Sequence, residues 1–368
     1  MSIHLGRLKK SKHIKICFIA SAASIHSHKW INYFSDLGHD IVWISLASSL
    51  LHISKNIDYY EINNNFFYNV YRIRSLVLKF NPDIVHIHYL GHNAMLGLFS
   101  GAKCIVATPW GSDVIEGKKS YFKRLIISKI LHKSSLITCD AYHMLEEVKT
   151  FDISSKKINI INFGIDTKHF SHKGVENKNL NNLGTSNKSK VISLRDFEPV
   201  YDIESFIRSM PLVLSEVPDV QFILLGRGTL KNNIRSMVRA MDLDNSVLFL
   251  DYVDNAKIPY ILSNADVLVS TSLSDAGIAA STAEAMSCEL PVVVTDSGEN
   301  NRWINHGENG FLVPVSNHRE LAKHIIKLLK NKELRNSMGV KARKTILNQN
   351  DYIIEMDKMN TLYQKLLQ

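Results

Sequence analysis

Cysteine is scarce in this sequence, with only four residues in a chain of 368. Cys17, Cys104, Cys139 and Cys288 lie far apart and among apolar neighbours. A disulfide-rich domain or a zinc site needs cysteines that are close together and regularly spaced, so neither class fits. We therefore expect a protein of a reducing compartment, the cytoplasm.

Long apolar runs are also missing, because no stretch approaches the roughly 20 residues that span a bilayer. The longest run near the N-terminus, Ile16–Ala23, follows a basic segment and superficially resembles a secretory signal. It is short for such a signal, and a plausible helix, His28–Leu37, follows it. We interpret the run as a first buried strand.

Motifs for cofactors and metals are absent or weak. The stretch Ala20–Ser27 contains no glycine, so the Gly-x-Gly-x-x-Gly motif of NAD-dependent oxidoreductases does not follow the first predicted strand. Residues 242–244 (Asp-Leu-Asp) match a metal-binding pattern, which we interpret as coincidence. We also interpret His86 and His88 as facing opposite sides of their strand, so that they do not share a metal ion. The sequence thus predicts no metal ion and no cofactor.

Acidic residues are under-represented in the first half of the chain. Residues 1–165 contain 20 lysines and arginines against 11 aspartates and glutamates, whereas residues 166–368 contain 24 of each class. The excess of positive charge therefore lies in the first half. This distribution predicts that the first half meets an anionic surface, such as phospholipid headgroups or a lipid pyrophosphate.

Short apolar runs alternate with amphipathic stretches along residues 1–165. Alternation at this spacing predicts parallel strands covered by helices, and hence a Rossmann-like, doubly wound α/β domain. The predicted helices include His28–Leu37 and Tyr121–His132. The predicted strands are Ile14–Ala20, Ile41–Leu46, Ile84–His88, Cys104–Thr108, Leu136–Cys139 and Ile158–Asn162.

A polar stretch separates this pattern from a second, similar one. Residues 171–190 are rich in Asn, Lys, Ser and Gly and bury little surface, so we place a linker at 166–190. A second Rossmann-like domain is predicted at 191–350, with a C-terminal helix at 351–368 that crosses back to the first domain. In open α/β sheets ligands bind beyond the carboxyl ends of the strands, so the expected site is the cleft between two facing domains. The predicted strands are Val191–Leu194, Gln221–Leu225, Val247–Leu250, Val267–Ser270, Pro291–Thr295 and Gly310–Val313, and the predicted helices are Ile203–Leu214, Leu230–Met241, Ala280–Ser287 and Arg319–Leu329.

Residues 266–314 carry the densest chemical signal. The strand Val267–Ser270 leads into a loop of small residues, 275–280, and then into a helix that begins near Ser281. Ser281 and Glu284 have the spacing of a capping box. Small residues before a helix N-terminus let a phosphate approach free backbone N–H groups and the positive end of the helix dipole. We therefore predict an anion-binding cradle.

This segment resembles the donor-site signature of family 4 (group 1) glycosyltransferases of the GT-B fold. The resemblance implies two facing Rossmann-like domains that transfer a sugar from a nucleotide carrier, with retention of the anomeric configuration. It rests on Glu284-Ala285-Met286, Pro291-Val292-Val293, Asp296 and residues 307–314 (GENGFLVP).

The resemblance assigns roles to residues of the second domain. It places Glu284 on the ribose hydroxyls and Arg195 on the donor diphosphate. The lysine that usually follows this arginine five residues later is Val200 here. Backbone groups of the cradle are expected to bind the diphosphate as well. The further predicted donor-binding residues are Gly226, Gly228, Ala279, Ala280, Ser281 and Thr282.

Two more positions depart from the family pattern. Many members carry a first glutamate eight positions before Glu284, where this chain has Ala276. We predict that Asp275 takes its place near the hydroxyls of the transferred sugar, as a catalytic residue. In the first domain, Trp110 occupies the place of a family histidine.

Other side chains of the first domain are predicted to complete the site. Trp110 and Asp113 are expected to contact the acceptor, and His26 and His88 are the imidazoles that we expect to take part in catalysis. The helix Lys118–Lys133 combines basic and apolar residues. Two interpretations stay open for it, packing of the apolar face on the sheet with solvated charges, or contact with a membrane surface.

The sequence thus predicts a glycosyltransferase that uses a UDP- or GDP-linked sugar and a glycan or lipid-linked glycan acceptor. We expect a role in cell-surface polysaccharide synthesis, such as lipopolysaccharide or capsule, and a location in the cytoplasm, peripheral to the inner membrane face. No nucleic acid partner is expected. Two alternatives stay open, a nucleotide-sugar epimerase of the same fold and a non-catalytic partner of another glycosyltransferase.

Overall fold

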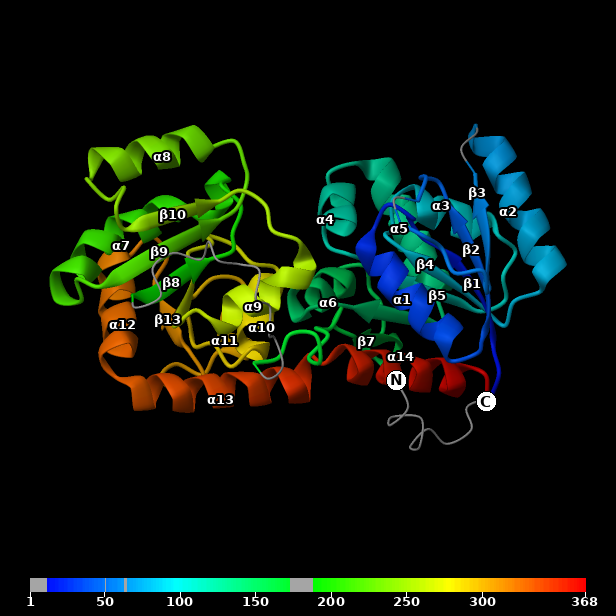
Figure 1. Cartoon of the computed structure of the whole chain (residues 1–368). Coiled ribbons are helices and arrows are strands. Elements are labelled where there is room, and N and C mark those ends of the chain that lie inside the picture. The colour runs from blue at the N-terminus through cyan, green and yellow to red at the C-terminus, as the bar shows by residue number, and fades with distance from the viewer. Residues whose placement is uncertain (1–11, 50, 63–64, 173–187) are drawn as a thin grey trace. The chain divides into compact units, whose positions relative to one another are not determined.

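A computed structural model describes residues 12–49, 51–62, 65–172 and 188–368. The chain divides into two compact units: unit 1 comprises Met1–Phe163 and Ile354–Gln368, and unit 2 comprises Gly164–Ile353. Most of the predicted linker, residues 173–187, lies outside the described residues. Each unit is built on one parallel β-sheet with helices on both faces (Figure 1).

In unit 1 the described strands form a seven-stranded parallel sheet in the order β3-β2-β1-β4-β5-β6-β7. The order reverses between β1 and β4, which is the doubly wound topology that the sequence predicts. The strands are β1 (Lys15–Ile19), β2 (Asp40–Ser45), β3 (Ile57–Glu61), β4 (Ile84–His88), β5 (Ile105–Thr108), β6 (Leu136–Cys139) and β7 (Ile158–Ile160). The helices are α1 (Ile25–Asp36), α2 (Phe66–Phe80), α3 (His92–Phe99), α4 (Ser112–Lys118), α5 (Tyr121–Lys133), α6 (Tyr142–Lys149) and the short η1 (Ser155–Lys157).

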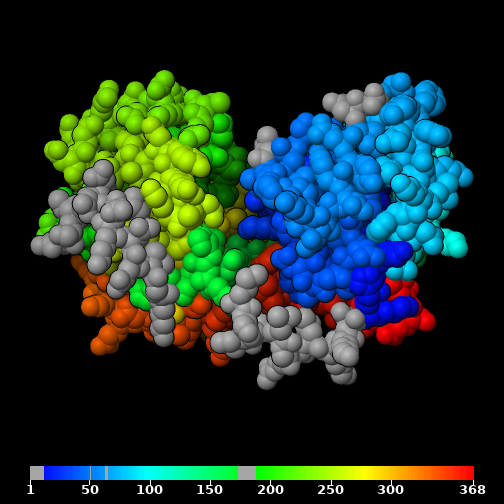
Figure 2. Space-filling view, turned by 45° about the vertical axis from the view of Figure 1, so that its right-hand side comes forward, coloured from blue at the N-terminus to red at the C-terminus, as the bar shows by residue number. Residues whose placement is uncertain are grey.

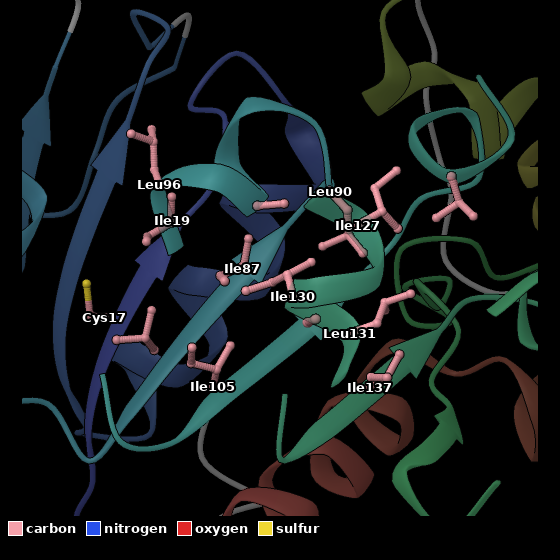
Figure 3. Close-up of a cluster of buried hydrophobic side chains, with 14 of the residues drawn as sticks. Cys17, Ile19, Ile87, Leu90, Leu96, Ile105, Ile127, Ile130, Leu131 and Ile137 are labelled. Carbon is pink, nitrogen blue, oxygen red and sulfur yellow. The ribbon is translucent and has the colours of Figure 1, made fainter. Parts of the chain in front are cut away.

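The core of unit 1 lies between this sheet and its helices. Figure 3 shows Ile87 and Ile105 of the central strands beside Ile127 and Ile130 of α5. Close packing leaves no room for a side chain at Gly97 of α3, because an added Cβ would overlap the end of Ile87. Ile127, Ile130 and Leu131 of α5 belong to this core.

The last helix, α14 (Tyr352–Leu366), packs on unit 1 through polar as well as apolar contacts. Asn360 Oδ1 lies 3.3 Å from His39 Nε2, and Glu355 accepts a 2.9 Å hydrogen bond from the backbone N–H of Asn162. The buried Tyr363 hydroxyl is hydrogen-bonded to His86 Nδ1. Residues distant in sequence therefore complete the first unit.

The expectation that His86 and His88 face opposite sides of their strand is wrong. Their ring centroids are only 4.4 Å apart. Residues two apart on a strand point to the same face, because successive side chains alternate.

Unit 2 repeats the topology with a six-stranded parallel sheet, in the order β10-β9-β8-β11-β12-β13 among the described strands. Apolar clusters cover both faces of this sheet. The strands are β8 (Ser189–Ser193), β9 (Val220–Leu225), β10 (Val247–Leu250), β11 (Val267–Ser270), β12 (Val292–Thr295) and β13 (Phe311–Val313). The helices are η2 (Pro199–Tyr201), α7 (Ile203–Glu216), α8 (Lys231–Ala240), η3 (Asn255–Lys257), α9 (Ile258–Ser263), α10 (Ala280–Ser287), α11 (Asn300–Trp303), α12 (His318–Lys330) and α13 (Lys332–Gln349).

No helix in the described part of the chain is both long enough and apolar enough to cross a membrane.

Candidate functional site

A buried ion pair lies at the carboxyl ends of the strands of unit 2. Arg195 follows β8, and Ser272 and Asp275 follow the neighbouring strand β11. The Arg195 guanidinium donates from Nε and Nη2 to Ser272 Oγ, at 2.9 and 2.6 Å, and Nη2 also pairs with the Asp275 carboxylate. The side chains of the ion pair are only 12% and 7% exposed. The guanidinium is therefore held in one orientation, and Nη1 takes part in none of these contacts.

An aromatic ring supports the same guanidinium from another side. The Arg195 guanidinium carbon lies 4.2 Å from the centroid of the Tyr201 ring, which is a cation–π geometry. Val200, which stands where the family usually has a lysine, is exposed. Arg195 is thus fixed by neutral and acidic neighbours. Position 200, a valine, supplies no second positive charge.

Asp275 also joins the loops that follow β11 and β12. Its second carboxylate oxygen lies 3.4 Å from Asn300 Nδ2, and the same amide donates to the Thr295 carbonyl at 3.0 Å. Thr295 and Ser297 both donate through their hydroxyls to the Ser272 carbonyl, at 2.5 and 2.9 Å. The two loops therefore form one hydrogen-bonded unit behind the guanidinium.

Three glycines let the backbone approach this unit closely. A Cβ at Gly298, which has φ +56°, would overlap the Asp275 carbonyl oxygen. A Cβ at Gly226 would overlap the Arg195 carbonyl oxygen, and one at Gly228 would overlap that of Phe197. The predicted glycine turn after β9 therefore serves to pack the β9–α8 loop against the segment that carries Arg195.

Helix α10 begins two residues earlier than the capping-box prediction requires, so that prediction is wrong. The N-cap residue is Ala279, whose side chain cannot accept a hydrogen bond, and Ser281 lies inside the first turn with Ala280 and Thr282. The first-turn N–H groups therefore lack a side-chain cap, and the dipole of the helix makes this end attractive to an anion. Glu284 lies half-buried on the next turn.

The carboxylate of Asp275, the residue predicted to contact the transferred sugar, is buried against Arg195 and Asn300. No sequence motif indicates a role for Ser272, Asn300 or Tyr201. Their signal in the sequence is weak, because each is a common residue in a loop after a strand or, for Tyr201, in a short turn of 3₁₀ helix.

An aromatic cluster occupies the corresponding end of the sheet in unit 1. The exposed His26 ring lies 4.3 Å from Phe163 and 6.0 Å from Trp110, measured between centroids. Desolvation beside these rings, together with the charge of Lys29, lowers the pKa of His26. Its imidazole is therefore neutral near pH 7 and able to accept a hydrogen bond.

His88 lies beneath this cluster with no exposed surface. Its ring is 4.9 Å from that of Trp30 and 5.9 Å from that of Trp110, and neither ring nitrogen has a hydrogen-bond partner among the described residues. Burial, with a smaller contribution from His26, lowers its pKa to about 3. The structure thus brings His26, His88 and Trp110 together, but leaves only His26 and Trp110 accessible.

The Asp113 carboxylate binds backbone N–H groups in this structure. Its carboxylate accepts hydrogen bonds from the N–H groups of Leu90 at 2.5 Å, Trp110 at 3.0 Å and Val114 at 3.0 Å. Burial raises its pKa, against the effect of these hydrogen bonds. Asp113, predicted to contact an acceptor, thus uses both carboxylate oxygens for backbone N–H groups.

Comparisons with known proteins give the family. The model described as glycosyl transferases group 1 matches residues 176–345, and the model described as glycosyl transferase 4-like matches residues 15–141. The chain belongs to the group 1 glycosyltransferases. This glycosyltransferase is 26% identical to N-acetyl-alpha-D-glucosaminyl L-malate synthase of Bacillus anthracis, over 90% of its own length and 91% of that protein. It is also 26% identical to UDP-Gal:alpha-D-GlcNAc-diphosphoundecaprenol alpha-1,3-galactosyltransferase of Escherichia coli, over 78% and 76% of the two chains.

Solved structures confirm the GT-B fold prediction. A glycosyltransferase from Rickettsia africae superposes with a TM-score of 0.81 at 18% identity, over 97% of this glycosyltransferase and 99% of that chain. Anabaena HepE in complex with UDP gives a TM-score of 0.81 at 16% identity, over 96% and 100% of the two chains.

Proposed function

We propose that this glycosyltransferase moves a sugar from a UDP- or GDP-linked donor to a glycan or lipid-linked glycan, with retention, in the synthesis of a cell-surface polysaccharide. The observation that carries the donor part is the fixed guanidinium of Arg195 at the carboxyl ends of the β8 and β11 strands. The complex of Anabaena HepE with UDP-glucose, a protein of the same fold, supports a nucleotide-sugar donor.

The proposed donor site uses charge and dipoles that are already in place. Arg195 Nη1 binds a phosphate oxygen, and the first-turn N–H groups of α10 bind the diphosphate at the helix N-terminus. Glu284 accepts hydrogen bonds from the ribose hydroxyls. As the glycosidic bond breaks, negative charge grows on the departing diphosphate, and the fixed cation and dipoles stabilise that charge without rearrangement.

In this proposal Asp275 holds Arg195 and does not bind the transferred sugar. A lone arginine on a flexible side chain would lose rotamer freedom on binding phosphate, which weakens the interaction. The contacts with Asp275, Ser272 and Tyr201 impose that order before the donor arrives. Such fixing compensates in part for the lysine that is missing at position 200.

The acceptor part of the proposal rests on unit 1. The exposed His26 and the half-buried Trp110 suit a sugar ring, since aromatic faces stack on the apolar faces of sugars and a neutral imidazole accepts a hydrogen bond from a hydroxyl. The E. coli relative is named for a lipid diphosphate acceptor, and the excess positive charge of residues 1–165 suits such a group. Retention is part of the proposal because the family resemblance implies it.

Two rival functions differ in what they need. An epimerase needs free acid and base carboxylates, whereas Asp275 is engaged with Arg195 and Asp113 with the backbone. A non-catalytic partner of another glycosyltransferase is favoured by the replacement of the family lysine and histidine by Val200 and Trp110. Release of UDP or GDP from the matching nucleotide sugar by the purified chain alone would exclude the second rival.

The test of the donor site is Glu284→Ala, followed by calorimetric titration with UDP and GDP. Each hydrogen bond from a ribose hydroxyl to a carboxylate is worth about 1.5–3 kcal/mol, so we expect affinity to fall by roughly a hundredfold. The matched control is Glu289→Ala, because Glu289 is a half-buried glutamate just after the same helix and should leave affinity unchanged. Wild-type affinity in Glu284→Ala would contradict the assigned ribose contact.

A further inference from the structure

Helix α2 of unit 1 is apolar on two opposite faces. Its inner face contributes Ile73 and Val77 to the core of the unit. Phe67, Tyr71 and Leu78 lie on the outer face, at helical spacings of four and seven residues, and are 82%, 68% and 66% exposed. A helix that is apolar all round is normally buried, and a contiguous exposed apolar patch normally marks a binding surface.

The outer face of α2 extends to a neighbouring helix. The ring of Phe66 lies 5.7 Å from that of Phe67 and 6.4 Å from that of Phe99, at the end of α3. Phe99 is itself about half exposed. We call Phe67, Tyr71, Leu78 and Phe99, with the basic residues Arg74 and Lys79 among them, the α2 surface. In Figure 2 the light-blue part of the chain that includes α2 lies on the right-hand side of the molecular surface.

The charges of this surface are all of one sign. Helix α2 contains Arg72, Arg74 and Lys79 and no aspartate or glutamate. Arg74 and Lys79 are exposed, and within the described part of the chain neither forms an ion pair with a carboxylate. Two copies of the chain that met through this surface about a twofold axis would bring like charges together, which disfavours a dimer.

The basic helix α5, the alternative membrane contact, is less suited. Its exposed apolar residues are Tyr121 and Phe122 in the first turn and Leu125, which is 40% exposed, whereas Ile127, Ile130 and Leu131 belong to the core. Lys118 and Lys119, just before the helix, already form ion pairs with glutamates. The exposed apolar residues of α2 extend over more of the helix, from Phe67 to Leu78.

We propose that the α2 surface docks on an anionic phospholipid bilayer. The rings of Phe67 and Tyr71 and the side chain of Leu78 enter the interfacial region, where aromatic side chains are stable because one end is apolar and the surroundings are partly wet. Arg74 and Lys79 lie against the phosphate groups of the lipids. This docking goes beyond glycosyl transfer and would bring the enzyme to the surface on which a lipid-linked acceptor resides.

The test is co-sedimentation with vesicles of phosphatidylcholine, with and without phosphatidylglycerol. We expect the wild-type chain to bind the vesicles that contain phosphatidylglycerol, and to be released by salt. The triple variant Phe67→Ser/Tyr71→Ser/Leu78→Ser should bind at least about tenfold more weakly, because three apolar side chains no longer enter the bilayer. Arg74→Gln/Lys79→Gln should lose about fivefold in vesicle affinity for each charge removed, and only on vesicles that contain phosphatidylglycerol.

Two further variants locate the effect. Val340→Ser/Leu347→Ser removes exposed apolar residues from α13 of unit 2 and should bind vesicles like the wild type. Tyr121→Ser/Phe122→Ser tests the rival helix α5 and should also leave binding almost unchanged. Loss of binding in this rival variant, with normal binding in the α2 triple variant, would overturn the proposal.

Measurements on the wild-type chain do not depend on whether the variants fold. On anionic vesicles, hydrogen exchange of the wild-type chain should slow in peptides of α2 and not in peptides of α5. Failure of the wild type to bind anionic vesicles would overturn the proposal, as would a dimer in solution that the α2 triple variant abolishes. Titration with UDP is independent of all these readouts, so failure of membrane docking is distinguishable from failure of the proposed donor site.

Discussion

The two units share one strand order but differ at the carboxyl ends of their strands. In unit 2 the loops there are joined by Arg195, Ser272, Asp275 and Asn300 into a network of buried, charged hydrogen bonds. In unit 1 the same end holds imidazole and indole rings, and His88 has no hydrogen-bond partner among the described residues. The first arrangement suits a strongly charged ligand, whereas the second suits the faces of a neutral ring.

Removal of Asp275 should cause the largest loss of stability, because it disrupts the charged network of unit 2. Asp275→Ala leaves the Arg195 guanidinium buried without its counter-ion, and loss of one partner of a buried pair costs about 3–5 kcal/mol. The double variant Arg195→Ala/Asp275→Ala should be more stable than Asp275→Ala alone, because no unpaired charge remains. The measurement is urea unfolding, followed by hydrogen exchange in peptides of unit 2.

The control for this prediction is the surface pair of unit 1 between Lys118 and Glu147. These side chains are about one third exposed, so Glu147→Ala should cost less than about 1 kcal/mol. Equal losses in Asp275→Ala and Glu147→Ala, or a double variant less stable than Asp275→Ala, would show that the network of unit 2 is no more than a surface ion pair.

The buried histidines of unit 1 should make this unit sensitive to acid. In the folded chain burial lowers the pKa of His88 to about 3, whereas an unfolded histidine takes up a proton near pH 6.5. As the pH falls below 6.5 the unfolded chain therefore binds a proton that the folded chain does not. The contribution of neutral His88 to the free energy of unfolding is fully present above pH 6.5. At pH 5 this free energy is lower by about 2 kcal/mol.

Replacement of His88 by an apolar ring checks this acid sensitivity. His88→Phe should change stability little at pH 7, because it removes a buried polar group without a partner. It should lose less stability than the wild type between pH 6.5 and pH 4, although burial also lowers the pKa of His86, which remains. Unfolding curves at several pH values measure the difference, and parallel pH profiles of the two chains would refute it.

Much of the fold follows from the sequence because hydrophobic periodicity reports burial directly. The predicted strands Ile84–His88, Val247–Leu250 and Val267–Ser270 coincide with β4, β10 and β11. Helix α2 (Phe66–Phe80) was not among the predicted helices. Strand β3 escaped prediction because its residues, IDYYE, are half polar at the edge of the sheet.

The site was less predictable than the fold, for a physical reason. The family resemblance indicated Arg195, and the local pattern indicated the small-residue loop before α10, but the partners of Arg195 depend on which strands lie side by side. Asp275 is 80 residues away in sequence and reaches the guanidinium only because β8 pairs with β11. The capping box failed for a smaller reason, since a start of α10 at Ala280 places Ser281 inside the helix.

A chain of buried hydrogen bonds connects α14 to the sheet of unit 1. Burial raises the pKa of Tyr363, so its hydroxyl stays protonated, and it is hydrogen-bonded to His86 Nδ1. His86 Nε2 lies 2.6 Å from Thr108 Oγ1, which lies 2.5 Å from the hydroxyl of Thr138. One hydroxyl on α14 is thus linked through a buried histidine to the centre of the sheet.

Tyr363→Phe should give a smaller effect on stability than the changes at Asp275 and His88. It tests whether unit 1 depends on buried polar contacts as unit 2 does. Loss of the hydroxyl leaves His86 Nδ1 buried without this hydrogen-bond partner, which costs about 1 kcal/mol, whereas the apolar packing of the ring is retained. Tyr33→Phe is the matched control, because its partner Asp357 on the same helix is only half-buried and can be hydrated instead. Urea unfolding should show a smaller loss for Tyr33→Phe, and hydrogen exchange in α14 should accelerate in Tyr363→Phe alone. If both variants behaved alike, α14 would be held on unit 1 by its apolar contacts. Buried polar contacts would then stabilise unit 2 and not unit 1.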